Sequence, residues 1–271
     1  MDAFRDRVAV ITGGAGGIGM AMAGAFAARG AKIVLGDLDA EALARGTAAL
    51  KEGGAEVLGV PVDVTIRDSV EELAARAIDH FGAVHILCNN AGVAPFGTMV
   101  QASHKDWEFT MGVNFWGVVH GIEAFMPRMV EQKQGGHIVN TASMAGLVGM
   151  QWLGLYCASK FAVVGLSESL YRELQPDGIG VSVLCPMIVA TNINENTVRM
   201  RPTAMRNPTE DPPPPPASAM KGGVIEPAEV GRRVVRGIER GDLYILTHPE
   251  QREFLRRRAA KLDRMFEEDL W

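Results

Sequence analysis

The sequence predicts an α/β protein: a single domain over residues 1–271, built on a doubly wound parallel sheet of about seven strands flanked by helices. Two observations carry this prediction. Short apolar runs alternate with longer helical patterns along the chain, which favours β-α-β units with right-handed crossovers. Nearly all the apolar runs are continuous rather than alternating, which is typical of strands buried on both faces of a parallel sheet.

The elements follow from this pattern in chain order. Each predicted strand is a short run rich in Val, Ile and Leu, and the strands cover 8–12, 32–36, 56–60, 86–89, 136–141, 180–185 and 243–246. The stretches between them have the apolar spacing of helices that pack one face on a sheet. These helices cover 17–29, 40–52, 67–81, 104–132, 153–175 and 227–240.

One segment, 192–225, interrupts the alternation because it has no strand pattern. Five consecutive prolines, Pro212 to Pro216, exclude helix interior and central strand there and favour an extended polyproline conformation. Long loops in compact domains are usually functional or disordered. This one leaves the carboxyl end of a strand, where open α/β sheets bind ligands. We therefore expect a flexible, proline-rich substrate lid, with a plain surface insertion as the alternative.

The C-terminal segment, 248–271, is charged and has a helical pattern. Its apolar side chains form a sparse stripe, made by Phe254, Leu255, Leu262, Met265 and Phe266. This stripe predicts a terminal helical tail that packs on its own subunit or on a neighbouring one.

Composition and charge limit the classes of function. Apolar residues make up 47% of the chain and charged residues 22%, as in an ordinary globular protein. The net charge of −5 gives no reason to expect nucleic acid as a partner. No apolar run approaches the roughly 18 residues of a membrane span, and the N-terminal segment has no signal-peptide core, so we expect a cytoplasmic protein without a membrane partner. The three cysteines are widely spaced and form no Cys/His cluster, so no metal is expected.

A glycine-rich segment follows the first predicted strand and opens the first predicted helix. Gly14, Gly16 and Gly19 have the G-x-G-x-x-G spacing. In such loops glycine permits a tight turn, and the backbone approaches a pyrophosphate that rests on the helix N-terminus. The setting predicts a Rossmann-type dinucleotide site.

An acidic residue, Asp37, stands at the end of the second predicted strand, eighteen residues after Gly19. A carboxylate there can accept hydrogen bonds from both hydroxyls of an adenosine ribose, and it repels a 2′-phosphate. No Arg or Lys occurs in the glycine loop or directly after Asp37, so we expect NAD rather than NADP as the cofactor. The alternative, a helix-capping role, fits Asp39 better than Asp37.

Tyr156 and Lys160 are four residues apart in a predicted helix, so both side chains share one face. A neighbouring ammonium favours the phenolate and lowers the pKa of a tyrosine, which can then exchange a proton with an alcohol oxygen. Taken alone, the pair has a simple structural alternative, because any exposed helix can carry these residues at this spacing. Its meaning depends on the rest of the chain.

With the glycine loop and this pair, residues 5–191 resemble the classical short-chain dehydrogenase/reductase family. The motifs stand in the family's order: Thr12-Gly13-x-x-x-Gly17-x-Gly19, then Asp63-Val64, then Asn89-Asn90-Ala91-Gly92, and then the catalytic tetrad Asn114, Ser143, Tyr156 and Lys160. Several motifs in order are far more specific than any one of them. The resemblance implies an NAD-dependent oxidoreductase that transfers hydride between an alcohol and its ketone.

The resemblance also implies a role for each motif. Tyr156 is the general acid/base, Lys160 lowers its pKa and binds the nicotinamide ribose, and Ser143 orients the substrate oxygen. Asn114 holds a water of a proton relay; the alternative is a satisfied amide in mid-helix, where Asn is a poor helix former and needs a local reason. Besides Tyr156 and Lys160, the residues implied to bind the cofactor are Gly13, Gly17, Ile18, Gly19, Asp37, Asp63, Val64, Asn90, Ala91, Gly92, Pro186, Val189 and Thr191.

One position departs from the family's pattern, because Met187 stands where a glycine commonly follows Pro186. Methionine adds a bulky, flexible side chain beside the expected nicotinamide site, which affects the shape of the substrate pocket more than cofactor binding. We expect the pocket wall to include Phe96, Ala145, Trp152 and Met187. The expected wall is apolar and has no Arg or Lys to hold a carboxylate. It favours a bulky hydrophobic secondary alcohol or ketone, aromatic or steroid-like.

The sequence leaves some alternatives open. The same site can oxidise an alcohol or reduce a ketone, so carbonyl reduction stays possible as the physiological direction. A catalytically silent NAD-binding regulatory protein is a further alternative, against which the complete tetrad argues. The family is commonly tetrameric, with helices here near 104–132 and 153–175 between subunits, so the resemblance implies a homotetramer or homodimer.

Overall fold

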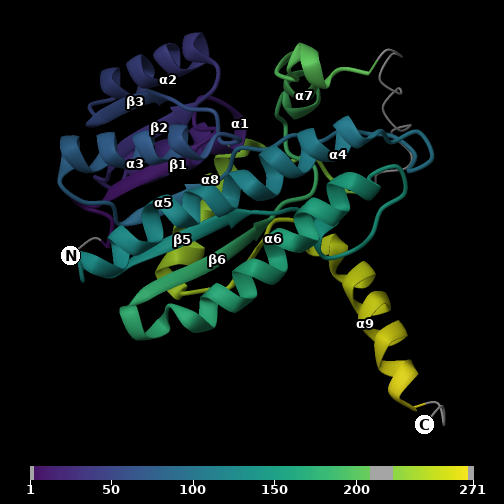
Figure 1. Cartoon of the computed structure of the whole chain (residues 1–271). Helices are drawn as coiled ribbons and strands as arrows, with labels where there is room; N and C mark the ends of the chain where they lie inside the picture. Colours follow the sequence, from purple (N-terminus) through teal and green to yellow (C-terminus); the bar gives the residue numbers. More distant parts are fainter. Residues whose placement is uncertain (1–2, 208–221, 268–271) are drawn as a thin grey trace.

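A computed structural model of the protein describes residues 3–207 and 222–267 and contains one seven-stranded sheet (Figure 1). Every strand pair is parallel, and the strand order is β3-β2-β1-β4-β5-β6-β7. The prediction of a doubly wound parallel sheet is confirmed, and each predicted strand end lies within one residue of the observed one. The strands are β1 (Val8–Thr12), β2 (Lys32–Asp37), β3 (Val57–Pro61), β4 (Ile86–Asn89), β5 (Gly136–Thr141), β6 (Ile179–Cys185) and β7 (Tyr244–Leu246).

Helices cover both faces of the sheet. On one face pack α1 (Gly17–Ala27), α2 (Ala40–Glu52) and α8 (Pro227–Arg240). On the other face pack α3 (Arg67–Phe81), α5 (Gly117–Glu131) and α6 (Gly154–Glu173), with α4 (His104–Met111) leading into α5. Among the helices of the described residues, none combines the length and the apolar character that crossing a bilayer requires.

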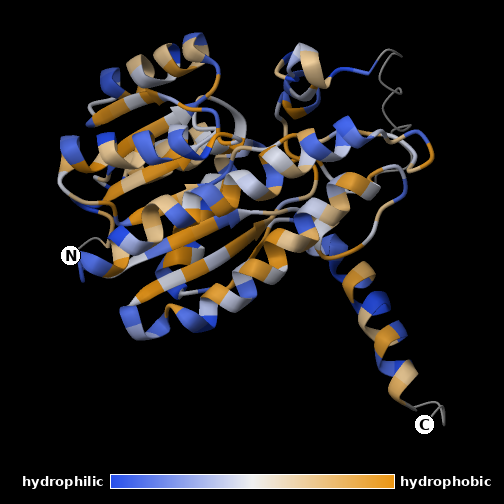
Figure 2. Ribbon diagram, in the orientation of Figure 1, coloured by the Kyte–Doolittle hydropathy of each residue, from blue (hydrophilic) through white to orange (hydrophobic). Residues whose placement is uncertain are grey.

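The sheet separates two apolar cores. Side chains alternate along a strand, so Val8 and Val10 of β1 face one core while Ala9 and Ile11 face the other. All five residues of β1 are buried, and Figure 2 shows the strands as a largely hydrophobic centre between helices with polar outer faces. Burial on both faces explains why the strands appear in the sequence as continuous apolar runs.

The predicted helix at 104–132 is interrupted by a short π-helical segment. Between α4 and α5 the chain passes through a five-residue π-helical segment, Gly112–Trp116. Such turns are rare and occur mostly at functional sites. Asn114 lies in the middle of this one, which is the local reason for an asparagine inside a long helix.

The described part of the segment 192–225 is more regular than predicted. A helix, α7 (Ile193–Arg199), is followed by a 3-10 turn, Thr203–Met205, and Ile225 returns to form a parallel bridge with Val189. The proline run from Pro212 to Pro216 lies outside the described residues. The role of this segment as a flexible substrate lid stays a prediction.

The last helix, α9 (Arg252–Glu267), leaves the body beside α6 and projects away from it (Figure 1). Near its start, the guanidinium of Arg258 stacks over the ring of Phe161 of α6, 5.4 Å from the ring centre. Further along, Leu262, Met265 and Phe266 are exposed. α9 therefore contacts its own subunit through Arg258, while Leu262, Met265 and Phe266 of the predicted apolar stripe are left in solvent.

Candidate active site

A cavity of about 560 Å³ opens at the carboxyl ends of the central strands. The chain changes direction between β1 and β4, so the loops after these two strands diverge and leave a crevice. The loops that follow β1 to β6, the start of α6 and α7 all contribute to the lining. Motifs that lie far apart in the sequence therefore meet in one place.

The glycine loop after β1 forms a backbone cradle. Gly13 and Gly17 have φ values of 60° and 51°, a conformation that favours glycine. A Cβ on Gly13 would lie 2.9 Å from the Cα of Ala91, whereas nothing lies within 4 Å of the Cβ position of Gly16. Gly16 is the N-cap of α1 and brings no capping side chain. The first N–H groups of α1 are therefore open to an anion such as a pyrophosphate.

Gly19 differs from the other predicted cofactor residues, because it does not line the cavity. A Cβ at Gly19 would collide with the carbonyl of Gly13 and lie 2.8 Å from Nδ2 of Asn90. Its glycine is required for the close approach of α1 to the loop, not for a cofactor contact. The other residues that the resemblance implied for the cofactor all line the cavity.

Asp37 ends β2 with its carboxylate fixed by two backbone groups. Oδ2 accepts from the N–H of Ala15 at 2.9 Å, and Oδ1 accepts from the N–H of Asp39 at 3.0 Å. The lone pairs that remain can accept from ribose hydroxyls in the cavity that Asp37 lines. Asp39 is the N-cap of α2 and accepts from the N–H of Ala42 at 2.9 Å, so the capping role belongs to Asp39.

Asn90 ties together three neighbouring strands under the cavity. Its Nδ2 donates to the carbonyl oxygens of Thr12 and Gly13 at 3.0 and 3.2 Å. Its Oδ1 accepts from the hydroxyl of Thr141 at 3.3 Å. The hydroxyl oxygen of Thr12 in turn accepts from the N–H groups of Asn90 and Ala91 at 3.0 and 3.2 Å. These bonds fix the distance between the glycine loop and the loops after β4 and β5.

Ser143, Tyr156 and Lys160 line the same cavity. Tyr156 and Lys160 share one face of α6, and Nζ of Lys160 lies 5.7 Å from the centre of the Tyr156 ring. This Nζ also donates to the carbonyl oxygen of Thr141 at 2.9 Å. The hydroxyl of Ser143 donates to the carbonyl oxygen of Pro186 at 3.3 Å and accepts from the N–H of Ala145 at 3.1 Å. A proton-transfer group, a cation and a hydroxyl thus stand together.

Burial dominates the protonation of this pair. It raises the pKa of Tyr156 to about 12, although the hydroxyl of Ser143 lowers the pKa in part. Burial also lowers the pKa of Lys160 to about 8. Lys160 is not among the groups that shift the pKa of Tyr156 here, so the lowering of that pKa by Lys160 stays a prediction.

Asn114 is fully buried and does not line the cavity. Its Nδ2 donates to the carbonyl oxygen of Val93 at 2.9 Å and to the hydroxyl of Ser159 at 3.1 Å. Its Oδ1 accepts from the N–H of Val93, also at 2.9 Å. Both amide hydrogens are in use, as the alternative of a satisfied amide predicts. The water relay through Asn114 stays a prediction.

The rest of the cavity wall is mainly apolar. It is formed by Val93, Ala94, Phe96, Phe109, Val113, Ala145, Met150, Leu153, Met187, Ile188, Ile193, Met200 and Pro202, among others. Three of the four predicted wall residues, Phe96, Ala145 and Met187, are in this set. The backbone N–H of Met187 donates to Nδ1 of the buried His248 at 3.4 Å, which ties this residue to the chain before α9.

Trp152 is the predicted wall residue that the structure places elsewhere. Its backbone has a φ of 63°, and its carbonyl oxygen accepts from the N–H of Gly97 at 2.9 Å. The loop turns sharply at this point. Met150 and Leu153, on either side of the turn, line the cavity in its place.

Among the lining residues that sequence reasoning missed are those of α7. Ile193, Asn196 and Arg199 of α7, with Met200 after it, close the cavity from above. Arg199 lines the cavity although the expected wall had no arginine, and its guanidinium pairs with Asp39 at 2.8 Å. A helix of seven residues is too short for a recognisable apolar period. The segment could be singled out, but its individual residues could not.

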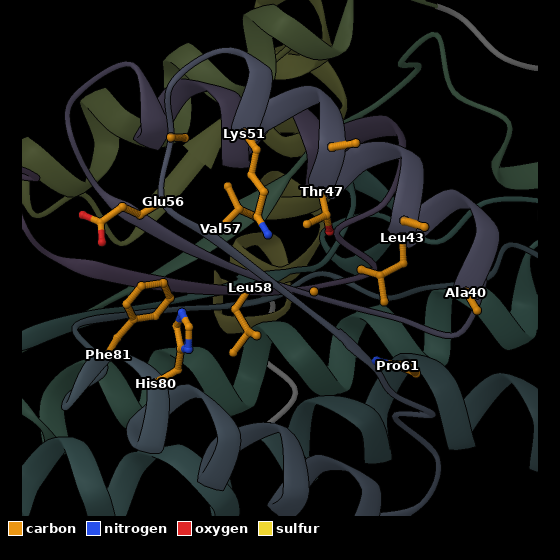
Figure 3. A pocket seen from close by; sticks show the side chains of 14 residues that line it. Ala40, Leu43, Thr47, Lys51, Glu56, Val57, Leu58, Pro61, His80 and Phe81 are labelled. Carbon is orange, nitrogen blue, oxygen red and sulfur yellow. The ribbon is translucent and has the colours of Figure 1, made fainter.

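A second hollow, of about 820 Å³, lies over the edge strand β3 between α2 and α3 (Figure 3). Leu43, Leu58 and Phe81 give it an apolar floor, and Lys51 and His80 stand at its margins. Of the described residues that line it, none belongs to the predicted site. The chemistry of the chain is concentrated in the cavity at the carboxyl ends of the strands.

Comparison with known proteins agrees with this site. A family model described as short chain dehydrogenase matches residues 7–202. A relative named C alpha-dehydrogenase, from Sphingobium sp., is 36% identical over 260 residues, which cover 94% of this chain and 85% of the relative. A relative named CLA biosynthesis dehydrogenase/reductase, from Lactiplantibacillus plantarum, is 35% identical, with 97% and 95% covered.

A solved structure with the same architecture is described as a short chain dehydrogenase/reductase from Burkholderia phymatum in complex with NAD. It superimposes with a TM-score of 0.91 at 40% identity, over 98% of this chain and 97% of the other. Residues 7–202, which the family model matches, contain the glycine loop, Asp37 and all four residues of the predicted catalytic tetrad. The chain belongs to the short-chain dehydrogenase family, as its motifs indicated.

Proposed function

We propose that the protein is an NAD(H)-dependent oxidoreductase that interconverts a bulky hydrophobic secondary alcohol and its ketone. The observation that carries this proposal is the meeting of the glycine cradle, Asp37 and the trio Ser143, Tyr156 and Lys160 in one cavity with an otherwise apolar wall. The NAD in the Burkholderia phymatum structure and the dehydrogenase names of both relatives support it.

The cofactor half of the proposal rests on the fit between the cavity and a dinucleotide. The open N-terminus of α1 and the unobstructed Cβ position of Gly16 suit a pyrophosphate. Asp37, held by the N–H groups of Ala15 and Asp39, suits an unmodified ribose and disfavours a 2′-phosphate. Pro186, Val189 and Thr191, which also line the cavity, would hold the nicotinamide.

The catalytic half assigns a task to each polar side chain. NAD, when bound, supplies the hydride acceptor, or the donor in its reduced form. Tyr156 takes the proton of the alcohol, or gives one to the ketone oxygen. Ser143 orients that oxygen by a hydrogen bond worth about 3 kcal/mol in the manner of an oxyanion-hole donor. Lys160 places a positive charge beside Tyr156 and has further N–H groups to bind the nicotinamide ribose.

The substrate assignment rests on the apolar wall of the cavity. Phe96, Met150, Leu153 and Met187 offer apolar surface. Of the residues that the structure describes, two basic ones line the cavity: Lys160, which donates to the carbonyl oxygen of Thr141, and Arg199, which pairs with Asp39. Both are engaged, so the wall gives a carboxylate or phosphate little to bind. Methionine side chains adapt to varied shapes, so we expect several apolar alcohols to be accepted.

Carbonyl reduction is the second candidate for the physiological direction, because the same site catalyses both directions and Tyr156 can donate a proton as well as accept one. A tyrosine with its pKa raised to about 12 is a proton donor at neutral pH, and reduction of a ketone needs a donor. Oxidation needs the phenolate. Rates in both directions on one alcohol–ketone pair, at pH 7 and pH 10, compare the two candidates directly.

The function is tested with a panel of substrates, followed by NADH absorbance. Apolar aromatic and polycyclic secondary alcohols should be oxidised with kcat/KM values at least about tenfold above those of sugars and hydroxy acids, because the wall has no free cation. NADP should be a poor substitute for NAD. A preference for charged or sugar substrates would overturn the substrate assignment. Tight NADH binding without turnover on any alcohol or ketone would favour a regulatory protein.

A homotetramer or homodimer is proposed as the assembly. α5 and α6 are the helices that the family places between subunits, and α9 adds a further argument. Leu262, Met265 and Phe266 expose 53%, 45% and 80% of their surface in a single copy of the chain. Large apolar side chains grouped at one end of a helix are typical of a surface covered by a partner.

A further inference from the structure

The roof of the cavity is tied to the body of the protein at separate points. Figure 1 shows α7 standing between α2 and α4. Three polar contacts hold α7 and the turn after it: Arg199 to Asp39, Thr197 to Ala94, and Arg201 to Asp106. A ligand in the cavity lies beneath α7, because Ile193, Asn196 and Arg199 line the cavity from above. The ligand can leave towards α2 only when the contact between Arg199 and Asp39 opens.

The contact between Arg199 and Asp39 is exposed to water. Nη1 of Arg199 lies 2.8 Å from Oδ2 of Asp39, and the two side chains are 56% and 17% exposed. Nη2 of Arg199 also donates to Oδ1 of Asn196 at 3.1 Å, which steadies the arginine. The N–H of Ala42 and the guanidinium of Arg199 keep the pKa of Asp39 below its usual value, so its carboxylate is charged at neutral pH. Water and salt compete with such a pair, so it opens readily.

The contact between Arg201 and Asp106 is buried. Nη2 of Arg201 lies 2.5 Å from Oδ1 of Asp106, and the side chains are 5% and 12% exposed. Nε of Arg201 donates to the carbonyl oxygen of Met205 at 2.9 Å, and its guanidinium stacks over Phe109 at 5.3 Å. Asn207 adds a donor to Asp106 at 3.1 Å. Separating buried charges leaves both uncompensated, so this end of the segment is fixed.

The exposed pair of Arg199 and Asp39 is therefore weaker than the buried pair of Arg201 and Asp106, although the two arginines are only two residues apart in the chain. We infer that Arg199 and Asp39 form a latch across the ribose side of the cavity, which slows release of the dinucleotide, while Arg201 and Asp106 form the fixed anchor about which α7 opens. The position of the latch supports this, because the N–H of Asp39 donates to Asp37, the carboxylate assigned to the ribose. The inference rests on the proposed function to the extent that NADH must bind in this cavity.

The test measures NADH release rather than turnover. Protein loaded with NADH is mixed in a stopped-flow instrument with excess NAD, and the loss of bound-NADH fluorescence gives the release rate. Two variants remove one partner each: Arg199→Met keeps the length of the stem, and Asp39→Asn keeps a good N-cap for α2. Each should release NADH about threefold to fivefold faster, the ratio expected for loss of an exposed ion pair. The double variant should be no faster than either single one, because both remove the same contact.

Arg206→Met is the matched control, since Arg206 is an exposed arginine of the same segment outside the latch. It should release NADH at the wild-type rate. Raising the salt concentration should speed release from the wild type and leave the double variant almost unchanged.

Three outcomes would overturn the latch. Wild-type release rates in both single variants would do so, as would additive effects in the double variant. Faster NADH release in Arg199→Met but not in Asp39→Asn would make Arg199 a direct cofactor contact instead. If the wild type binds no NADH, the latch and the proposed function fail together, whereas normal binding with unchanged release rejects the latch alone.

Discussion

Tyr156 and Lys160 lie on one face of α6, as their spacing requires, but their pKa values are set by burial. The pKa of Tyr156 rises to about 12 and that of Lys160 falls to about 8. Each shift disfavours the charged form, and each is the expected effect of removing a charge from water. The hydroxyl of Ser143 acts on the pKa of Tyr156 in the opposite direction.

Replacing Tyr156 by phenylalanine removes the hydroxyl and keeps the ring. Tyr156→Phe should lower kcat by at least about a thousandfold in both directions, because general acid/base catalysis and its coupling to Ser143 are lost together. NADH binding, measured by fluorescence titration, should stay within about twofold of the wild type. Turnover at the wild-type rate would show that another group carries the proton.

Asp37 is the residue on which cofactor choice is expected to depend. Asp37→Asn keeps an acceptor for the N–H of Ala15 and removes the charge. The ratio of the NADPH to the NADH dissociation constant should fall by about tenfold or more, because the repulsion of the 2′-phosphate is lost. Fluorescence titration with both reduced cofactors measures the ratio. An unchanged ratio would remove Asp37 from cofactor selection, and Asp63→Asn serves as a comparison in the same cavity.

Individual residues were predictable where chemistry fixes the residue type and not where packing does. Ser143, Tyr156, Lys160 and Asp37 were found because few other residues serve their tasks. Gly19 and Trp152, which were expected in the site, do not line the cavity, because packing determines their surroundings. The need for glycine at position 19 arises from the carbonyl of Gly13 and the amide of Asn90, which only the fold brings near. The turn at Trp152 is invisible in the sequence because its φ of 63° is unusual for tryptophan.

Among the secondary-structure elements, strands β5 and β6 are joined by a buried histidine, His137 of β5, whose protonation should make their packing depend on pH. Nε2 of His137 hydrogen-bonds the hydroxyl oxygen of Ser182 at 2.8 Å, and this hydroxyl donates to the carbonyl oxygen of Asp242 at 2.6 Å. Burial lowers the pKa of His137 from 6.5 to about 4. The unfolded chain takes up this proton near pH 6.5, and the folded chain takes it up near pH 4. Between these values the unfolded state binds more protons, so stability falls as the pH falls.

The free energy of unfolding should therefore decrease as the pH is lowered from 6.5 to 4, by up to about 3 kcal/mol from this histidine. Urea unfolding at several pH values measures the slope. His137→Asn should flatten it, whatever its effect on stability at pH 7. His104→Asn, at an exposed position in α4, should keep the wild-type slope. Equal slopes in all three proteins would exclude His137 as the source.

The long elements were predictable, and the irregular ones were not. Strands with all residues buried and helices of three or more turns leave a periodic record in the sequence. The π-helical segment at Gly112–Trp116 does not, because one extra residue in a turn changes the apolar spacing too little to detect. α7 is formed by its docking on Asp39, Ala94 and the anchor at Asp106, which are distant in the chain. Its existence depends on tertiary contacts rather than on local preference.

For the whole molecule, the order of elements along the chain was sufficient to place the cavity. Alternating strands and helices require parallel pairing, and the change of direction between β1 and β4 brings the glycine loop beside Asn90. The position of α9 could not be predicted in this way. Its apolar stripe predicts that one face of the helix is covered, but it does not predict whether the same subunit or a neighbouring one covers that face. In the structure, Leu262, Met265 and Phe266 remain exposed while Arg258 stacks on Phe161.

The assembly of the molecule provides the last prediction. Light scattering should give a mass at least twice that of the 29.1 kDa chain at micromolar concentration. Leu262→Glu should raise the dissociation constant by about tenfold, because a charge replaces an apolar contact between copies. Ala260→Glu adds the same charge on the other side of α9 and should leave the mass unchanged. A monomeric wild type would contradict the proposed assembly. An intact oligomer with equal masses for both variants would show that α9 lies outside the interface and that α5 and α6 form it without α9.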